Sequence, residues 1–230
     1  MNILAIETSC EIGSIALLSG ADLLECELDG IAAHSEGVLP GIDWLLAEAG
    51  LTVSGLDAIA FGSGPGAFTG LRLACGVAQG LALGGGHGVI PVCSLEALAS
   101  LCPEQRILAA TDARLGELYF CFYERDGDGT LVAQGEPACA RPEAPAVREG
   151  KWFGVGSGFA VHGEALRSRL GEALVGFDAE VIPRAAQVAR LAAARLRRGE
   201  VVTPQHAAPL YVRDKVALTT AERLASGGRA

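Results

Sequence analysis

ILAIET, at residues 3–8, has a counterpart at residues 107–112, where the chain reads ILAATD. Each copy is a short apolar run with an acidic residue near its end, and such runs are typical of buried strands. Each is followed by a glycine, Gly13 or Gly116, at which the second strand of a hairpin is expected to begin. The repeat therefore predicts two lobes that start with the same strand pattern.

The segments around the first copy alternate between strand and helix patterns. Ser35, Thr69 and Ser94 stand where a side chain typically caps a helix start. Three strands followed by alternating helices and strands are typical of a ribonuclease H-like lobe with a mixed sheet. Strands are expected over 2–7, 13–18, 22–29, 56–61 and 88–92, and helices over 35–49, 70–83 and 94–101.

The second copy begins a similar order, with a strong hairpin turn at Asp126–Gly129. We therefore expect an α/β fold of two ribonuclease H-like lobes with mixed sheets, which is the actin-like ATPase architecture. Residues 1–105 would form the first lobe, with the partner-binding helices, and residues 106–230 the second, with the C-terminal helix and tail. Strands of the second lobe are expected over 107–112, 117–124, up to about 134, and over 151–155, and helices over 159–170 and 184–198.

In two-lobed folds of this kind, each hairpin can close on the phosphates of a nucleotide. Thr8, beside Glu7, is the candidate in the first hairpin, and Asp112, near Arg114, is the candidate in the second. Gly156 is a third candidate, because glycines allow a backbone to approach an adenine or a ribose closely. The alternative is that all of these are turn residues in a degenerate pair of lobes.

The loop GSGPGAFTGLR, residues 62–72, resembles a phosphate-binding loop at the head of a helix. It lacks the lysine of a P-loop, and the strand expected at 88–92 does not end in the acid that a dinucleotide fingerprint requires. We therefore interpret its glycines as packing residues that turn the chain from a strand into the next helix.

The helix expected after this loop carries Gly76, Gly80 and Gly84 at intervals of four, flanked by Leu73 and Val77. Glycine inside a helix costs about 1 kcal/mol relative to alanine, so such a stripe suggests the close approach of another helix. The sequence leaves open whether that helix is the one at 35–49 or belongs to another chain.

Charge and spacing patterns exclude several function classes. The net charge is −9, and residues 1–71 hold ten acidic side chains and no Lys or Arg, which argues against a general nucleic-acid-binding protein. No histidine or cysteine spacing matches a metal site, no G-x-S-x-G serine motif occurs, and Asp57 lies at the wrong end of its strand for a two-metal nuclease. The stretch between Arg72 and Glu96 has no charge, but Gly84–Gly88 breaks it, so no membrane span is expected. Scattered cysteines and the absence of a signal peptide pattern indicate a cytoplasmic protein.

Four stretches of this chain resemble the TsaB (YeaZ) family of bacterial tRNA threonylcarbamoyladenosine biosynthesis proteins. They are Ile3–Ser9, Gly64–Arg72, Asp112–Arg114 with Glu117 and Tyr119, and Pro209–Arg213. Glu7 stands where the family more often has Asp, and Ala67 where it more often has Ser. The first departure weakens any nucleotide or metal site in the first lobe.

The resemblance implies a non-catalytic subunit that helps to transfer threonylcarbamoyl to N6 of the adenosine 3′ of the anticodon, in tRNAs that read codons beginning with A. The partner would be the transferase TsaD, which would carry the ATP and the metal, together with the ATPase TsaE. This chain would need no cofactor, would dimerise when alone, and would meet tRNA only within the complex. Its first-lobe helices would bind the partner through Val38, Ile42, Leu45, Leu73, Gly76, Val77 and Gly80.

Two other functions remain open at this point. One is an independent ATPase or small-molecule kinase that uses the cleft between the lobes. The other is a tRNA-binding subunit that uses the basic residues of the last expected helix, because 14 basic residues stand against nine acidic ones from Arg141 onward. Those residues are Arg184, Arg190, Arg195, Arg197 and Arg198.

Overall fold

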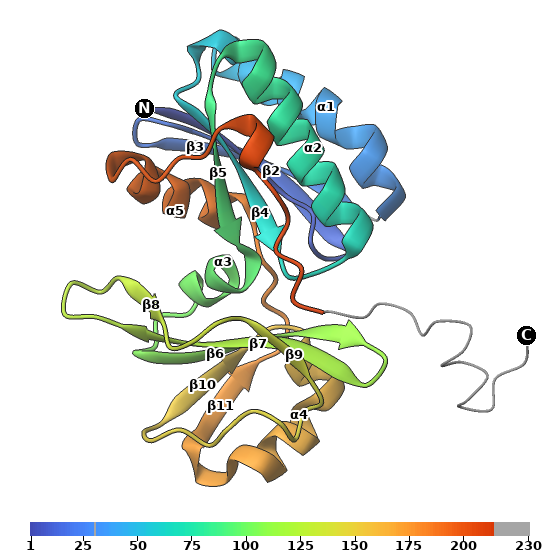
Figure 1. The fold of residues 1–230 in the computed structure, drawn as a ribbon, viewed down its shortest axis with the longest axis vertical. Coiled ribbons are helices and arrows are strands. Elements are labelled where there is room, and N and C mark those ends of the chain that lie inside the picture. The colour runs from blue at the N-terminus through green and yellow to red at the C-terminus, as the bar shows by residue number, and fades with distance from the viewer. Residues whose placement is uncertain (30, 214–230) are drawn as a thin grey trace, which may run out of the picture.

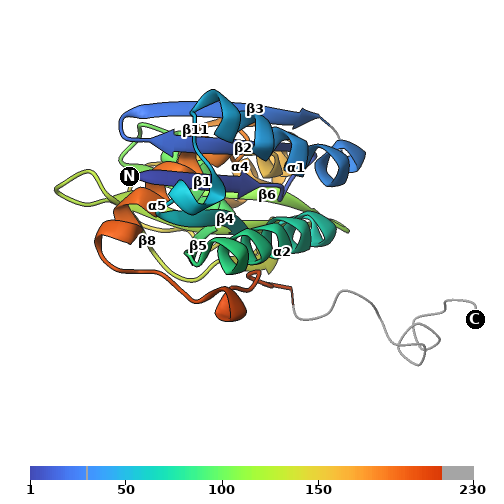
Figure 2. The ribbon, with the colours of Figure 1, turned by 90° about the horizontal axis from the view of Figure 1, so that it is seen from above.

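The first lobe is built on a five-stranded mixed sheet, which the computed structural model shows in the order β3-β2-β1-β4-β5 (Figure 2). The structure describes residues 1–29 and 31–213. β1 (Asn2–Glu7), β2 (Ile12–Ser19) and β3 (Asp22–Asp29) are antiparallel, whereas β4 (Ala58–Gly64) and β5 (Gly88–Cys93) run parallel to β1. The central residues of β1, Ile3–Ile6, are all apolar because both faces of the sheet are covered: Leu4 and Ile6 pack on one side, and Ile3 and Ala5 on the other.

Helices α1 (Ile31–Glu48) and α2 (Phe68–Gly85) cover one face of this sheet (Figure 1). The other face is covered by α5 (Ala185–Arg197) and by part of α3 (Ser94–Ser100). A short 3-10 helix, Val53–Gly55, precedes β4. The first lobe therefore has three layers, in which the sheet lies between two helical layers.

The second lobe repeats the strand order of the first. From β8 (Leu131–Ala133) the order is β8-β7-β6-β10-β11, with β7 (Glu117–Arg125) antiparallel to β6 (Arg106–Arg114) and to β8. β10 (Trp152–Val155) and β11 (Leu174–Asp178) are parallel to β6, and β9 (Ala138–Ala140) pairs with β7. This repetition confirms the predicted pair of ribonuclease H-like lobes.

α4 (Gly158–Leu170) covers one face of the second sheet, and α3 covers the other. α3 thus packs against both sheets and lies between the two lobes (Figure 1). Two further 3-10 helices lie at Gly171–Ala173 and Pro204–His206. Within the described residues, no helix is long and apolar enough to cross a membrane.

The structure corrects the predicted place of the last helix. Residues 184–198 were expected to complete the second lobe, but α5 packs on the first sheet, where its alanine-rich face and Val188 are buried against Ile3, Ala60 and Ile90. Small side chains allow α5 to approach the strands closely. The second lobe is therefore built from residues after 105 that end before α5, and the chain then returns to the first lobe.

The predicted helix starts also need correction. α1 begins at Ile31 because no breaker separates it from Ser35, which lies inside the helix. α2 begins at Phe68 with Ala67 at the N-cap position, so Thr69 does not cap it. Ser94 is the first residue of α3 rather than its cap. Strands β9 and β11 were not predicted, because both are short and lie in stretches without a clear alternating pattern.

Candidate functional site

The glycine-rich loop between β4 and α2 packs against the β1–β2 hairpin of its own lobe. A Cβ atom at Gly62 would lie 2.0 Å from a carboxylate oxygen of Glu7, and one at Gly70 would lie 1.8 Å from the carbonyl oxygen of Thr8. The N–H of Ala67 also donates to the carbonyl oxygen of Ser9, at 2.7 Å. These glycines are thus needed for close contact with the hairpin, which supports the packing interpretation of the loop.

The polar side chains of the first hairpin are hydrogen-bonded to other groups of the chain. Glu7 is fully buried and accepts hydrogen bonds from the N–H of Ser9 (2.7 Å) and the hydroxyl of Ser94 (2.8 Å). Burial raises the pKa of Glu7, although these hydrogen bonds oppose the shift. The hydroxyl of Thr8 donates to the carbonyl of Gly70 at 2.8 Å and is buried. This geometry does not fit a bound phosphate or metal, because Glu7 and Thr8 face the protein interior.

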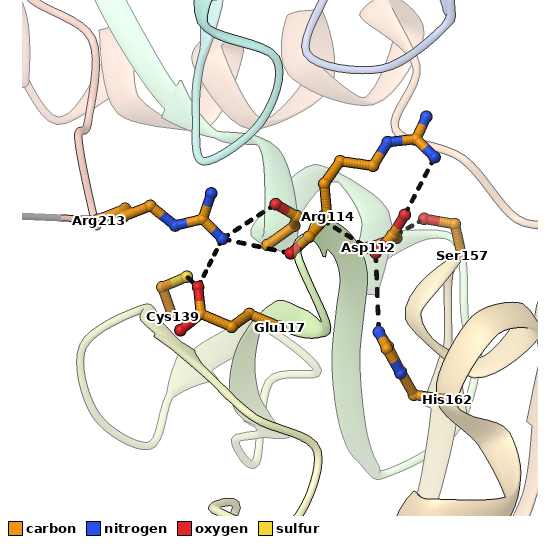
Figure 3. Close-up of polar contacts among 8 residues, drawn as sticks. Asp112, Arg114, Glu117, Cys139, Ser157, His162 and Arg213 are labelled. Carbon is orange, nitrogen blue, oxygen red and sulfur yellow. Dashed lines mark hydrogen bonds and ion pairs between the residues drawn. The ribbon is translucent and has the colours of Figure 1, made fainter. Parts of the chain in front are cut away.

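The second hairpin holds Asp112 in a network of protein contacts (Figure 3). Its carboxylate lies 3.2 Å from Arg114 Nη1 and 3.7 Å from His162 Nε2, and its side chain is 12% exposed. The backbone N–H of Asp112 donates to the hydroxyl of Ser157 at 3.1 Å. Gly156 has a φ of +103°, and a Cβ there would lie 2.5 Å from the carbonyl oxygen of Ala110. Both nucleotide candidates of the second lobe thus have structural roles, and nucleotide binding stays a prediction.

Residues 207–213, which we name the C-terminal strap, connect the two lobes. The N–H of Leu210 donates to the carbonyl of Ser63 in the first lobe, at 2.7 Å. Arg213 donates to the carbonyl of Ala113 (3.0 Å) and to the carboxylate of Glu117 (2.6 Å) in the second lobe (Figure 3). An exposed ion pair, Arg114 to Glu11, also links the two hairpins.

The surface of α1 and α2 carries an open apolar groove of about 400 Å³. Among the described residues, a Cβ atom added at Gly76, Gly80 or Gly84 would meet no atom within 4 Å outside its own helix backbone, so the glycine stripe faces away from the first sheet. The helix at 35–49, which lies within α1, therefore does not pack against the stripe, and its approach by a helix of another chain stays a prediction. The groove is lined by Leu39, Arg72, Leu73, Gly76, Val77, Gly80 and Leu81.

Three of the predicted interface residues are not on this surface. Val38, Ile42 and Leu45 are at most 1% exposed and pack against the first sheet, because the periodic apolar stripe of α1 is its core-facing side. Sequence reasoning also missed large apolar side chains of the two helices that lie off the buried stripe. They are Leu39, Trp44, Phe68 and Leu83, between 46% and 57% exposed.

Three of the five arginines within or flanking α5 form ion pairs within the first lobe. Arg184 pairs with Glu25 (3.1 Å) and Glu27 (2.6 Å), and Arg195 pairs with Glu96. Arg198 pairs with Glu200, whereas Arg190 and Arg197 are exposed. No group of three or more possible metal ligands occurs among the residues that the structure describes.

Comparison with known proteins identifies the family. The chain is 34% identical to the tRNA threonylcarbamoyladenosine biosynthesis protein TsaB of Escherichia coli K12, over 94% of this chain and 96% of that protein. The chain belongs to the TsaB family. The TsaB protein of Haemophilus influenzae is 31% identical over 94% of this chain and 95% of its own length.

Solved structures agree with this assignment. YeaZ from Pseudomonas aeruginosa superposes with a TM-score of 0.82 at 38% identity, over 91% of this chain and 99% of that chain. A second structure, described as an uncharacterized protein with similarity to peptidase YEAZ from the same organism, gives a TM-score of 0.84 at 37% identity, over 92% and 99% of the two chains. The family model described as TsaD, tRNA N6-adenosine threonylcarbamoyltransferase, matches residues 30–221 of this chain.

Proposed function

We propose that this TsaB-family chain is a non-catalytic accessory subunit in the formation of threonylcarbamoyladenosine in tRNA, and that it acts by binding a TsaD-type transferase through α1 and α2. The observation that carries the proposal is the outward glycine stripe of α2 beside an apolar groove. Membership of the TsaB family, whose relatives are named for this biosynthesis, supports the pathway.

The glycine stripe favours a protein helix as the occupant of the groove. Glycines without neighbours let a partner backbone approach closely, and exposed apolar side chains such as Leu39 and Leu83 gain free energy when they are covered. The same face would form the homodimer when the partner is absent, so the two assemblies would compete.

The proposed sites for ATP, metal and tRNA follow from the contacts of the first hairpin and of the arginines near α5. The first hairpin fits neither phosphate nor metal, so we assign the ATP and the metal to the TsaD-type partner, with the TsaE-type ATPase joining the complex. Three of the five arginines within or flanking α5 are paired within the lobe, so tRNA would be bound only by the complete complex. We propose that the chain works in the cytoplasm.

The native mass of the chain, alone and mixed with the TsaD-type protein of the same source, tests this proposal. We expect a homodimer that converts to a heterodimer on mixing. Gly80→Leu should abolish the heterodimer, because a bulky side chain would fill the groove, and should keep the native circular dichroism spectrum. Gly127→Leu is the matched control, since Gly127 also has open space but lies in a turn of the second lobe. Heterodimer formation by Gly80→Leu at the wild-type affinity would contradict the proposal.

A further inference from the structure

Arg72 lies at the end of the groove and is held in a fixed position by two aromatic rings. Its guanidinium carbon lies 3.8 Å from the centroid of the Phe68 ring, and its Nε donates to the hydroxyl of Tyr211 at 3.1 Å. The rings of Phe68 and Tyr211 are themselves 5.6 Å apart. Phe68 belongs to α2 and Tyr211 to the C-terminal strap, so two separate segments position one guanidinium group.

The remaining donors of Arg72 point to an external acceptor. A guanidinium has five N–H donors, and only the Nε–H of Arg72 has a partner among residues 1–29 and 31–213. No carboxylate in that part of the chain forms an ion pair with it, although the neighbouring helix α1 exposes Glu36, Asp43 and Glu48. Within the described residues, the exposed Arg72 side chain is therefore held by Phe68 and Tyr211, and its two Nη groups have no hydrogen-bond partner.

We propose that Arg72 is the receptor for a carboxylate on a helix of the partner protein, whose apolar side chains occupy the adjoining groove over Gly76 and Gly80. This inference rests on the proposed function and adds a specificity-determining residue to it. A planar guanidinium binds a carboxylate through two parallel hydrogen bonds, and prior ordering by Phe68 and Tyr211 reduces the entropy lost on binding. Phe68 and Tyr211 are positioning residues in this arrangement.

The surrounding charge favours a single carboxylate over a polyanion such as RNA. Arg72 is the first basic residue of the chain, and ten acidic residues precede it. Binding of a nucleic acid typically requires several cations on one surface, and the exposed acids of α1 would repel it. One carboxylate within an apolar contact needs only one cation, which this surface provides.

The test measures the dissociation constant for the TsaD-type protein over a series of salt concentrations. Arg72→Gln should weaken binding at least about tenfold and reduce its dependence on salt, because a charge pair is lost. Arg72→Lys should recover little of the affinity, because lysine lacks the planar fork. Tyr211→Phe keeps the ring and removes the hydrogen bond, so a smaller loss is expected. Arg190→Gln, on the exposed side of α5, is the matched control and should bind as wild type does.

The outcomes distinguish a failure of this inference from a failure of the proposed function. If Arg72→Gln binds with wild-type affinity and salt dependence while Gly80→Leu does not bind, the carboxylate receptor is wrong and the proposed function stands. If Arg72→Gln weakens only the homodimer, the acceptor lies on a second copy of this chain and the inference is wrong. If the wild-type chain does not bind the TsaD-type protein, both fall. Rescue of Arg72→Glu by one acidic-to-lysine change on the partner would identify the acceptor.

Discussion

Glu7 shows that the direction of one buried side chain depends on residues distant in the sequence. Its carboxyl group lies over Gly62 and accepts hydrogen bonds from Ser9 and Ser94, so the donors at the turn of the first hairpin are directed inward. The sequence indicated that an acid stands at this place but not which way it points. The direction depends on Gly62 and Ser94, which are distant in sequence and meet Glu7 only in the folded sheet.

The burial of Glu7 predicts a distinct pH dependence of stability. Because the folded-state pKa is raised above the ordinary value of 4.5, the folded state binds the proton more tightly than the unfolded state does. The stabilisation from the protonated acid is fully present below about pH 4.5 and is lost as the pH rises through the folded-state pKa. Glu7→Gln should lack this loss, so its stability relative to wild type should increase as the pH rises from 4 towards neutrality.

Urea unfolding of both proteins at several pH values would measure this difference. Asp57→Asn is a suitable control, because the Asp57 side chain is half exposed and lies at the opposite end of the sheet. A constant difference in unfolding free energy between wild type and Glu7→Gln across this pH range would contradict the prediction.

Other candidate residues show the same limit of residue patterns. Asp112 and Gly156 were chosen because acids and glycines at these places can bind nucleotides, and the structure places both near the end of β6. Asp112, in β6, contacts His162 of α4, and Gly156, after β10, lies against Ala110 of β6. No short-range sequence pattern connects the residues of either pair. The sequence therefore predicted the positions of these residues, whereas their contacts could be seen only in the tertiary structure.

At the scale of elements, helix α2 has two faces with opposite requirements for glycine. On the inner face, Gly70 contacts the first hairpin so closely that no other residue fits without a shift. On the outer face, Gly76 and Gly80 have open space. The spacing of glycines predicted a close approach by another helix, and it could not show that only some of these glycines are buried.

This difference predicts opposite effects of the same substitution. Gly70→Ala should reduce the free energy of unfolding by about 1–3 kcal/mol, because the new methyl group overlaps the carbonyl of Thr8. Gly76→Ala should increase it by about 0.5–1 kcal/mol, because alanine is the better helix former and meets no neighbour. The second variant should nevertheless bind the TsaD-type protein more weakly, since a methyl group would enter the groove.

Urea unfolding of the isolated chains and titration with the partner would check both parts. A gain in stability with unchanged binding would show that the partner does not contact α2 at Gly76. A stable Gly70→Ala variant would show that the loop can move away from the hairpin.

Helix α1 explains why part of the predicted interface was incorrect. Its apolar stripe through Val38, Ile42 and Leu45 was correctly recognised, but periodicity alone does not tell whether a stripe faces its own sheet or a partner. Leu39 and Trp44, which are apolar residues off this stripe, are exposed and are the better candidates on α1 for contact with a partner.

At the scale of the whole molecule, the duplicated strand order could be predicted and the path of the chain between lobes could not. Each lobe has its own hydrophobic pattern, which defines strands and helices locally. The alanine-rich face of α5 fits any apolar sheet surface, so its sequence does not specify the first sheet. In the folded chain, α5 covers the sheet face opposite to the one that α1 and α2 cover.

After the second lobe, the chain returns to the first lobe as α5. The C-terminal strap then runs from the first lobe back to the second. Arg213 is its anchor, because its guanidinium bonds the carbonyl of Ala113 and the carboxylate of Glu117 and is 15% exposed. Arg213→Gln would leave these acceptors without their charged donor. We expect a loss of about 1.5–3 kcal/mol in the free energy of unfolding and faster amide hydrogen exchange in the β6–β7 hairpin and along residues 207–213.

Arg114→Gln provides the matched control for this prediction. It removes the contact of Arg114 with Glu11 between the lobes and its pair with Asp112 within the second lobe. Because the Arg114 side chain is 71% exposed, the cost should stay below about 1 kcal/mol. Hydrogen exchange followed by mass spectrometry on both variants would separate the two contacts. Equal exchange in wild type and Arg213→Gln would show that Leu210 and the packing of α3 hold the lobes together without the strap's arginine. Faster exchange that extends to the Phe68 end of α2 would show that the strap couples the second lobe to the partner-binding groove.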